Sequence, residues 1–257
     1  MLRSRLVFLI YLCLEIGLVS LFVLLIFQRH LHTTDFVKPK IDFSSQITNE
    51  LKNVSTSTKK VALTFDDGPS FETLKILNIL KQENIHATFF VVGKFAEMHP
   101  EILKKEVDYG NQIGNHSYDH SKFLAKIGSA ELLANIQKNQ NVIENLVGGQ
   151  PKIFRPPYGN LSNRMIQTLE KAGYKIVLWN VDPRDWDIKN NPAGIEKNIE
   201  DNVKNNSIIL LHDGKSNYVG NDSKKLTDEN TEVILQDLIL KLKGEGYEFV
   251  TLDELYK

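Results

Sequence analysis

The amino-acid sequence predicts an α/β protein whose parallel strands, about seven in number, form a distorted (β/α) barrel. From about residue 60 onward, short β-rich segments alternate with helical segments, which favours parallel βα units. Polar clusters directly follow five of the predicted strands. An open doubly wound sheet also fits the alternation, but it gathers ligands at a single switch point. The strand ends of a barrel all converge on one face, so five clusters favour the barrel.

The predicted strands are short runs with β-type composition, and the segments between them have helical spacing. Helices are expected around Leu74–Leu80, where leucine recurs every three residues, and in a last segment closed by Gly244. Ser129 and Ser162 can cap two more helices, with Gly173 just past the end of the second. The predicted strands are Val61–Phe65, Ala87–Val92, Gln112–Asn115, Lys152–Phe154, Lys175–Val181, Ser207–Leu211 and Glu248–Thr251.

The N-terminal part of the sequence differs in kind from the rest. Residues 6–27 are apolar apart from one charge, and at about 1.5 Å per residue such a run spans a bilayer core of about 30 Å. We therefore expect a cytoplasmic stub (1–5), a transmembrane anchor (6–27), a linker (28–58) and a folded domain (59–257) outside the cell membrane. The alternative is a secreted protein released by signal cleavage. Bulky residues at the end of the run, where a cleavage site needs small ones, favour the anchor.

Composition excludes some classes of protein. The chain is 42% hydrophobic with a formal net charge of −1, so it lacks the basic excess of nucleic-acid-binding proteins, and no nucleic-acid partner is expected. The single cysteine, Cys13, excludes an internal disulfide framework. The oligomeric state stays open.

Two adjacent carboxylates, Asp66 and Asp67, follow the first predicted strand. Neighbouring side chains on a strand point to opposite sides, so we expect different roles, one as a metal ligand and one as a base. Asp-Gly-Pro is also good turn chemistry, and a purely structural turn is the alternative here.

Two histidines, His116 and His120, bracket three residues after the third strand. Imidazole is the commonest protein ligand for zinc-like ions, and two histidines with one carboxylate leave positions open for water and substrate. A loop pair without a metal is the alternative. His86 and His99 have no such partners, and we interpret them as structural or surface residues.

Three more clusters follow strands. Arg155, in a segment stiffened by two prolines, can bind a carboxylate through two hydrogen bonds. An aspartate that bonds the ring of a histidine such as His212 fixes its tautomer and raises its pKa, as a general acid needs. Trp186 fits either the core or a pocket wall, and its polar neighbours favour the wall.

Together these segments resemble the five ordered motifs of the polysaccharide deacetylases, the NodB-homology enzymes of carbohydrate esterase family four. The resemblance covers about residues 61–255. It departs at Ser121, where many relatives have proline, and residues 215–225 have no clear chemical signature. The five segments are TFDDGP (Thr64–Pro69), HSYDH (His116–His120), RPPYG (Arg155–Gly159), DPRDW (Asp182–Trp186) and ILLHD (Ile209–Asp213).

The resemblance implies a distorted barrel that binds one divalent metal ion, usually zinc, with cobalt or another divalent ion as alternatives. Asp67, His116 and His120 would be the metal ligands. Asp66 would be the general base that takes a proton from the attacking water, and Arg155 would pair with Asp66.

The resemblance also implies roles around the leaving group. His212 would protonate the departing amine, and Asp185 would orient His212. The backbone N–H of Tyr158 would bind the oxyanion. Trp186 and Leu210 would wall the pocket for the acetyl methyl group.

The implied reaction is the hydrolysis of N-acetyl groups on an amino-sugar polymer. The predicted anchor favours a substrate at the bacterial cell surface, and we predict peptidoglycan N-acetylglucosamine. The alternatives are chitin oligomers, another surface glycan or acetyl-xylan, or a catalytically silent glycan-binding protein on the same fold. The sequence retains every implied ligand, base and acid, which argues against the silent protein.

Overall fold

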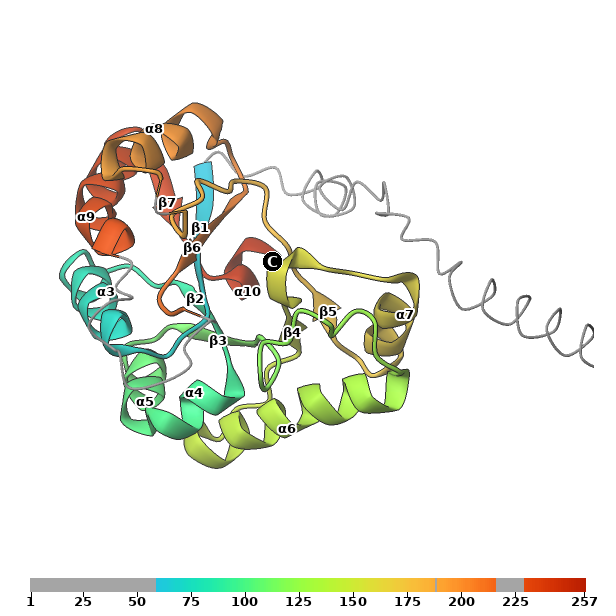
Figure 1. Ribbon diagram of the computed structural model, residues 1–257. Coiled ribbons are helices and arrows are strands. Elements are labelled where there is room, and N and C mark those ends of the chain that lie inside the picture. Colours follow the sequence, from blue (N-terminus) through green and yellow to red (C-terminus); the bar gives the residue numbers. More distant parts are fainter. Residues whose placement is uncertain (1–58, 188, 216–228) are drawn as a thin grey trace, which may run out of the picture. The chain divides into compact units, whose positions relative to one another are not determined.

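The computed structural model describes residues 59–187, 189–215 and 229–257 (Figure 1). The predicted stub, anchor and linker lie outside the described residues, as does the segment 216–228. Across the described ranges, no helix has the length and apolar character needed to cross a membrane.

The described residues form one sheet of seven parallel strands, which confirms the α/β class. The strands lie in the order β5-β4-β3-β2-β1-β6, and β7 pairs with the beginning of β1. The sheet curls into a half-barrel. Its strands are β1 (Lys59–Asp66), β2 (Thr88–Val91), β3 (Gln112–Asn115), β4 (Ile153–Phe154), β5 (Lys175–Ile176), β6 (Ser207–His212) and β7 (Tyr247–Phe249).

The predicted strand Lys175–Val181 is interrupted, and only its first two residues form β5. The segment begins against β4 and ends against β6, where the carbonyl oxygen of Val181 accepts a hydrogen bond from the backbone N–H of Leu210 (2.9 Å). Between these ends, the buried Arg155 side chain donates to the carbonyl oxygens of Val177 (3.4 Å) and Leu178 (3.1 Å). Because these carbonyls bond to a side chain, the segment leaves the regular strand pattern.

The two faces of β1 have different surroundings. Val61, Leu63 and Phe65 are buried in the main hydrophobic cluster together with residues of the helices. Ala62 belongs to a second cluster on the opposite face. Since strand side chains alternate, Asp66 lies on the same face as Ala62, at the end of the strand.

The helices surround one side of the sheet in the order α8, α9, α3, α5, α6, α7 (Figure 1). The four expected helices are present as α3, α6, α7 and α9, whereas α4, α5, α8, α10 and a short 3₁₀ turn were not predicted. The helices are α3 (Phe71–Gln82), α4 (Gly93–Met98), α5 (Pro100–Asp108), α6 (Ser129–Val147), α7 (Asn163–Lys171), α8 (Pro192–Asn202), α9 (Glu229–Gly244) and α10 (Leu252–Leu255), and the turn is η1 (Pro157–Gly159).

The predicted boundaries of α7 are confirmed. The Ser162 side chain accepts a hydrogen bond from the backbone N–H of Met165 (3.2 Å), which caps the helix. Gly173 follows the helix with a φ of +80°, a conformation that glycine adopts without strain.

The predicted end of the last helix is also confirmed, because Gly244 is the last residue of α9, and a left-handed residue follows at Gly246 (φ +86°). The predicted cap of α6 is wrong. Gly128 is the N-cap, and the hydroxyl of Ser129 instead contacts the hydroxyl of Thr168 on α7 (2.8 Å), a partner that residue type alone does not specify.

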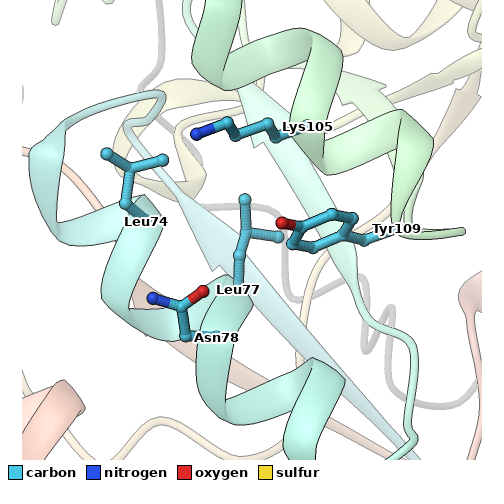
Figure 2. A pocket seen from close by; sticks show the side chains of 5 residues that line it. All are labelled: Leu74, Leu77, Asn78, Lys105 and Tyr109. Atoms are coloured by element: carbon cyan, nitrogen blue, oxygen red, sulfur yellow. The ribbon is translucent and has the colours of Figure 1, made fainter.

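A cavity of about 140 Å³ lies between α3 and α5 (Figure 2). It is lined by Leu74, Leu77, Asn78, Lys105 and Tyr109. None of these residues belongs to the five motifs, so the cavity is separate from the polar strand ends.

Candidate active site

The polar motifs meet at the carboxyl ends of the parallel strands. β1 ends at Asp66 and β6 ends at His212, and these two residues are register partners on the paired strands. β3 ends at Asn115, directly before His116, and β4 ends at Phe154. Motifs that are distant in sequence therefore lie side by side at one edge of the sheet.

Asp66 and Asp67 face the same site, so the expectation that they point to opposite sides is wrong. Asp67 lies just after β1 with a left-handed φ of 75°, so strand alternation does not govern its direction. Asp66 Oδ2 lies 3.7 Å and Asp67 Oδ1 lies 3.4 Å from His116 Nε2. One imidazole thus faces both carboxylates.

Asp67, His116 and His120 form a buried group of candidate metal ligands. Their candidate ligand atoms all lie within 4.8 Å of one another, and His120 Nε2 is 3.0 Å from Asp67 Oδ1. Burial raises the pKa of Asp67, but the hydrogen bonds and charges of the two histidines outweigh burial and hold that pKa well below its usual range. Burial lowers the pKa of His116, but the charges of Asp66 and Asp67 raise it overall.

The tautomer of His116 leaves its Nε2 available as a metal ligand. His116 Nδ1 lies 2.7 Å from the carbonyl oxygen of Arg155, and since a carbonyl only accepts, the ring hydrogen belongs on Nδ1. In a neutral ring, Nε2 then presents a lone pair toward the Asp67 carboxylate. Two electron-rich atoms 3.4 Å apart require a cation or a proton between them. One carboxylate and two imidazoles are a donor set that zinc binds.

Side-chain amides that sequence reasoning missed hold the loop that carries both histidines, and those of Asn115 and Asn139 are buried. Asn115 Oδ1 accepts from the backbone N–H of Ser117 (2.9 Å), and Asn139 on α6 donates to the Ser117 carbonyl (2.9 Å). Asn135, one turn earlier on α6, accepts from the backbone N–H of Tyr118 (2.9 Å). The available signal was two asparagines four residues apart on a helix, which places them on one face.

Arg155 fixes the position of Asp66. The wholly buried Arg155 side chain donates from Nη1 to Asp66 Oδ1 (2.7 Å) and to Thr64 Oγ1 (2.8 Å). Its guanidinium lies 4.0 Å from the centre of the Phe90 ring. The expected double hydrogen bond to a carboxylate is absent among these contacts, because Nη2 donates to the carbonyl of Leu178 instead.

His212 and Asp185 form a hydrogen-bonded pair. Asp185 Oδ1 lies 2.8 Å from His212 Nδ1, and Asp185 Oδ2 accepts from the backbone N–H of His212 (2.8 Å). Burial lowers the pKa of His212, but the nearby Asp185 charge and hydrogen bond, aided by Asp67 and Asp66, raise that pKa to about 10. The ring is therefore protonated at neutral pH and has a proton to donate.

Two buried threonines complete the site, and sequence analysis missed both. Thr231 on α9 donates to Asp185 Oδ2 (2.6 Å), and Thr73 on α3 donates to Asp213 Oδ2 (2.6 Å). The backbone N–H of Asp213 donates to the carbonyl of Asp66 (3.1 Å), which ties the end of β6 to the end of β1. Neither threonine carries a sequence signal, because a threonine in a helix resembles any other small residue of the helix layer.

The three predicted pocket residues lie at different depths. Tyr158 is 50% exposed, has a φ of 59°, and its ring centre is 4.6 Å from that of His120. Trp186 is 47% exposed, with the Arg184 guanidinium 5.0 Å from its ring centre. Leu210 is buried on β6, two residues before the strand ends.

Comparisons with known proteins agree with this arrangement. The sequence pattern of the family described as polysaccharide deacetylase matches residues 53–177. A peptidoglycan-N-acetylglucosamine deacetylase of Bacillus cereus is 38% identical over 200 residues, which cover 77% of this chain and 68% of that protein. The peptidoglycan-N-acetylglucosamine deacetylase PgdA of Listeria monocytogenes is 38% identical over 202 residues, which cover 78% of this chain and 39% of that protein.

The peptidoglycan-N-acetylmuramic acid deacetylase PdaC of Bacillus subtilis is 35% identical over 223 residues, which cover 85% of this chain and 43% of that protein. The solved structure of PdaC has a TM-score of 0.68 at 33% identity and covers 79% of this chain and 92% of the solved chain. This chain thus spans less than half the length of the Listeria and B. subtilis proteins. The ordered motifs, the curled parallel sheet and these identities agree, and the chain belongs to the polysaccharide deacetylase family.

Proposed function

We propose that this chain hydrolyses the N-acetyl groups of peptidoglycan N-acetylglucosamine, which yields acetate and a free amine on the sugar. One observation carries the proposal: the ligand group Asp67, His116 and His120 lies beside the register partners Asp66 and His212. Metal-dependent hydrolysis of an amide at neutral pH uses a Lewis acid, a base for water and an acid for the leaving nitrogen.

Asp67, His116 and His120 would hold one divalent ion, which we assign as zinc. A bound zinc ion lowers the pKa of water and polarises a carbonyl oxygen. The carbonyl of Arg155 orients His116, as partners of metal-ligating histidines do. Three protein ligands leave a position open for chemistry.

Asp66 is the proposed general base. Its Oδ1 is held by Arg155, and its Oδ2 faces the ligand group through His116. Asp66 would accept a proton from the water whose oxygen attacks the acetyl carbonyl carbon. The fixed guanidinium keeps the carboxylate oriented for that step.

His212 is the proposed general acid. Its proton would go to the amide nitrogen as the carbon–nitrogen bond breaks, so that the sugar leaves as an amine and the acetyl group leaves as acetate. Asp185 holds the ring through Nδ1, which directs the other ring nitrogen to the substrate.

Three residues would bind the acetyl group. The left-handed φ of Tyr158, between two prolines and Gly159, holds its backbone N–H in a fixed direction as the proposed oxyanion donor. Trp186 and Leu210 would wall the pocket for the methyl group. Leu210 is already buried on the strand that ends at His212.

The choice of sugar rests on the relatives. The B. cereus and L. monocytogenes proteins are described as acting on N-acetylglucosamine, and the B. subtilis protein as acting on N-acetylmuramic acid. We assign N-acetylglucosamine because the two relatives with the higher identity share that description.

The test is an assay of the purified full-length chain on peptidoglycan, chitin oligomers and acetyl-xylan. We expect amine release from peptidoglycan, loss of release on chelation, and recovery with added zinc or cobalt. Mass spectrometry of the digested product would identify the deacetylated sugar. Full activity in a preparation shown to be metal-free by elemental analysis would refute the mechanism, and glycan binding without acetate release would indicate the silent form.

We further propose that residues 6–27 anchor the chain in a bacterial cell membrane with the deacetylase domain outside. The support is the apolar run of these residues, which has the length of a membrane-spanning helix. Cell fractionation tests the proposal. A native protein found in the culture medium with its N-terminus beyond Phe27 would contradict the anchor and indicate a cleaved signal.

A further inference from the structure

We propose that Thr231, in the first turn of α9, is a positioning residue for the general acid: its hydroxyl fixes the Asp185 carboxylate that orients His212. The inference rests on the proposed function, since it assigns the acid role to His212. It adds a residue from outside the five motifs to the proton-transfer machinery.

Both carboxylate oxygens of Asp185 accept hydrogen bonds. Oδ1 accepts from His212 Nδ1 (2.8 Å), and Oδ2 accepts from the backbone N–H of His212 (2.8 Å) and from the hydroxyl of Thr231 (2.6 Å). Asp185 is 1% exposed and Thr231 is fully buried, so water does not compete for these contacts. Three donors on one carboxylate define its plane, because rotation about the side chain would break at least one of them.

Asp185 needs such a constraint because its own backbone segment is irregular. It lies between the bridge at Val181 and the start of α8, directly after Arg184, which has a left-handed φ of 58°. Side chains on loops are held less accurately than those on regular elements. Thr231 lies on a regular helix, so its hydroxyl is a hydrogen-bond donor whose position does not depend on this loop.

The first turn of α9 is itself anchored. Glu232, the residue after Thr231, pairs with Lys75 on α3 (2.7 Å), and further along the helix Ile234, Leu235 and Leu238 lie in the main core. α3 begins shortly after the loop that carries Asp67. Thr231 thus ties Asp185 to the same helix layer that borders the metal ligands.

Among the described residues, loss of the hydroxyl would leave Asp185 Oδ2 with the backbone N–H of His212 as its one hydrogen-bond donor. The carboxylate would then rotate, and the ring of His212 would lose its fixed direction. Mutation of the outer partners of metal-ligating histidines typically changes activity about 10–100-fold, and we take this range as the scale for a partner of Asp185. We expect Thr231→Val, which keeps the shape of the side chain, to lower kcat about tenfold at the low end of that range, with KM unchanged.

The matched control is Thr88. It is also a fully buried threonine, at the start of β2 and away from the strand ends that carry the motifs. Its hydroxyl donates to Gln112 Oε1 (3.0 Å) and accepts from the backbone N–H of Leu252 (3.1 Å). Thr88→Val removes both hydrogen bonds, so it measures the effect of a loss of stability at least as large, away from the site. Thr231→Ser restores the hydroxyl at the tested position.

The experiment compares Thr231→Val, Thr231→Ser and Thr88→Val in the full-length chain by steady-state kinetics and by NMR of the His212 ring, assigned with His212→Gln. In the wild type and in Thr231→Ser and Thr88→Val, we expect a protected Nδ1–H signal and kcat within about twofold of one another, well inside the tenfold effect expected of Thr231→Val. In Thr231→Val we expect the signal to broaden or vanish. In an Asp185→Ala background, Thr231→Val should have no further effect on kcat.

An intact ring signal with unchanged kcat in Thr231→Val would overturn the proposal, as would an equal loss in Thr88→Val or no rescue by serine. The ring signal does not depend on turnover. A wild-type chain that releases no amine therefore refutes the proposed function, while the signal still decides whether Thr231 positions the pair.

Discussion

The candidate site has two halves that are built differently. The metal half consists of Asp66, Asp67, His116, His120 and Arg155. Asp66 is the last residue of β1, the other four lie in the segments after β1, β3 and β4, and all five are buried.

In the acid half, His212 ends β6, but Asp185, Trp186 and Tyr158 lie on irregular segments, and the two aromatic side chains are about half exposed. The metal half therefore begins at strand ends, and side-chain amides hold the loop that carries its two histidines. The acid half is positioned by side-chain hydrogen bonds and is accessible to a substrate.

The largest expected effect separates two adjacent residues of the metal half. Asp66→Asn should retain the metal and lower kcat by about 10²–10⁴-fold, because it removes a general base. Asp67→Asn should weaken metal affinity by more than about 100-fold, the upper range for outer partners of a ligand. Elemental analysis of bound metal and kcat measured at saturating zinc distinguish the two variants. Asp201→Asn, at an exposed ion pair, is the control, and the reverse pattern would exchange the two roles.

The next prediction tests how strongly the metal half depends on burial. Arg155→Met leaves Asp66 buried without its cation, and removal of one partner of a buried pair typically costs about 3–5 kcal/mol. Urea unfolding at pH 7 measures the loss. Arg184→Met removes an exposed pair with Asp187 and should cost less than about 1 kcal/mol. Similar losses in both variants would mean that burial does not distinguish the two pairs.

In the acid half, stability should depend on alkaline pH. Burial lowers the pKa of His212, but Asp185 raises it to about 10. Because the folded pKa lies above the unfolded value of about 6.5, the protonated ring stabilises the fold fully below pH 6.5. This contribution is lost as the pH rises through about 10.

His212→Gln should therefore remove this dependence in the metal-free protein. The difference in unfolding free energy between wild type and variant should shrink steadily between pH 7 and pH 10 in denaturant titrations. A constant difference across that range would show that Asp185 does not hold the proton on His212.

The smallest expected effect concerns the exposed rim. Trp186→Ala should raise KM about tenfold with kcat nearly unchanged, because an exposed aromatic side chain contributes mainly uniform binding. Trp186→Phe should recover part of the loss. Leu240→Ala, an exposed apolar residue on α9, is the control. A large loss of kcat in Trp186→Ala would assign Trp186 to the reacting centre instead.

The metal half was more predictable from the sequence than the acid half. Asp67 and His116 directly follow strands, and His120 lies in the same loop as His116, so their proximity follows from a parallel sheet. Their directions did not follow, because the left-handed φ of Asp67 overrides strand alternation.

Thr231 and Asp185 are 46 residues apart, and no local pattern links a threonine on a helix to an aspartate on a loop. The interruption after β5 was equally hidden, since it depends on where the guanidinium of Arg155 lies in space.

The pairing of β1 also has a consequence for the order of events during synthesis. β1 carries Asp66 at its end, yet two of its three partner strands, β6 and β7, come much later in the chain than β2. Thr64 bonds to a residue 145 positions further on, and Lys59 to one 186 positions further on. At about 5–20 residues per second, the ribosome needs about 10–40 s to supply the later of these partners. During that time the apolar run Val61–Phe65 has no native neighbours on β6 or β7. The nascent chain should therefore depend on chaperones during this interval, and chains that stop before β6 should have no metal affinity of the native kind.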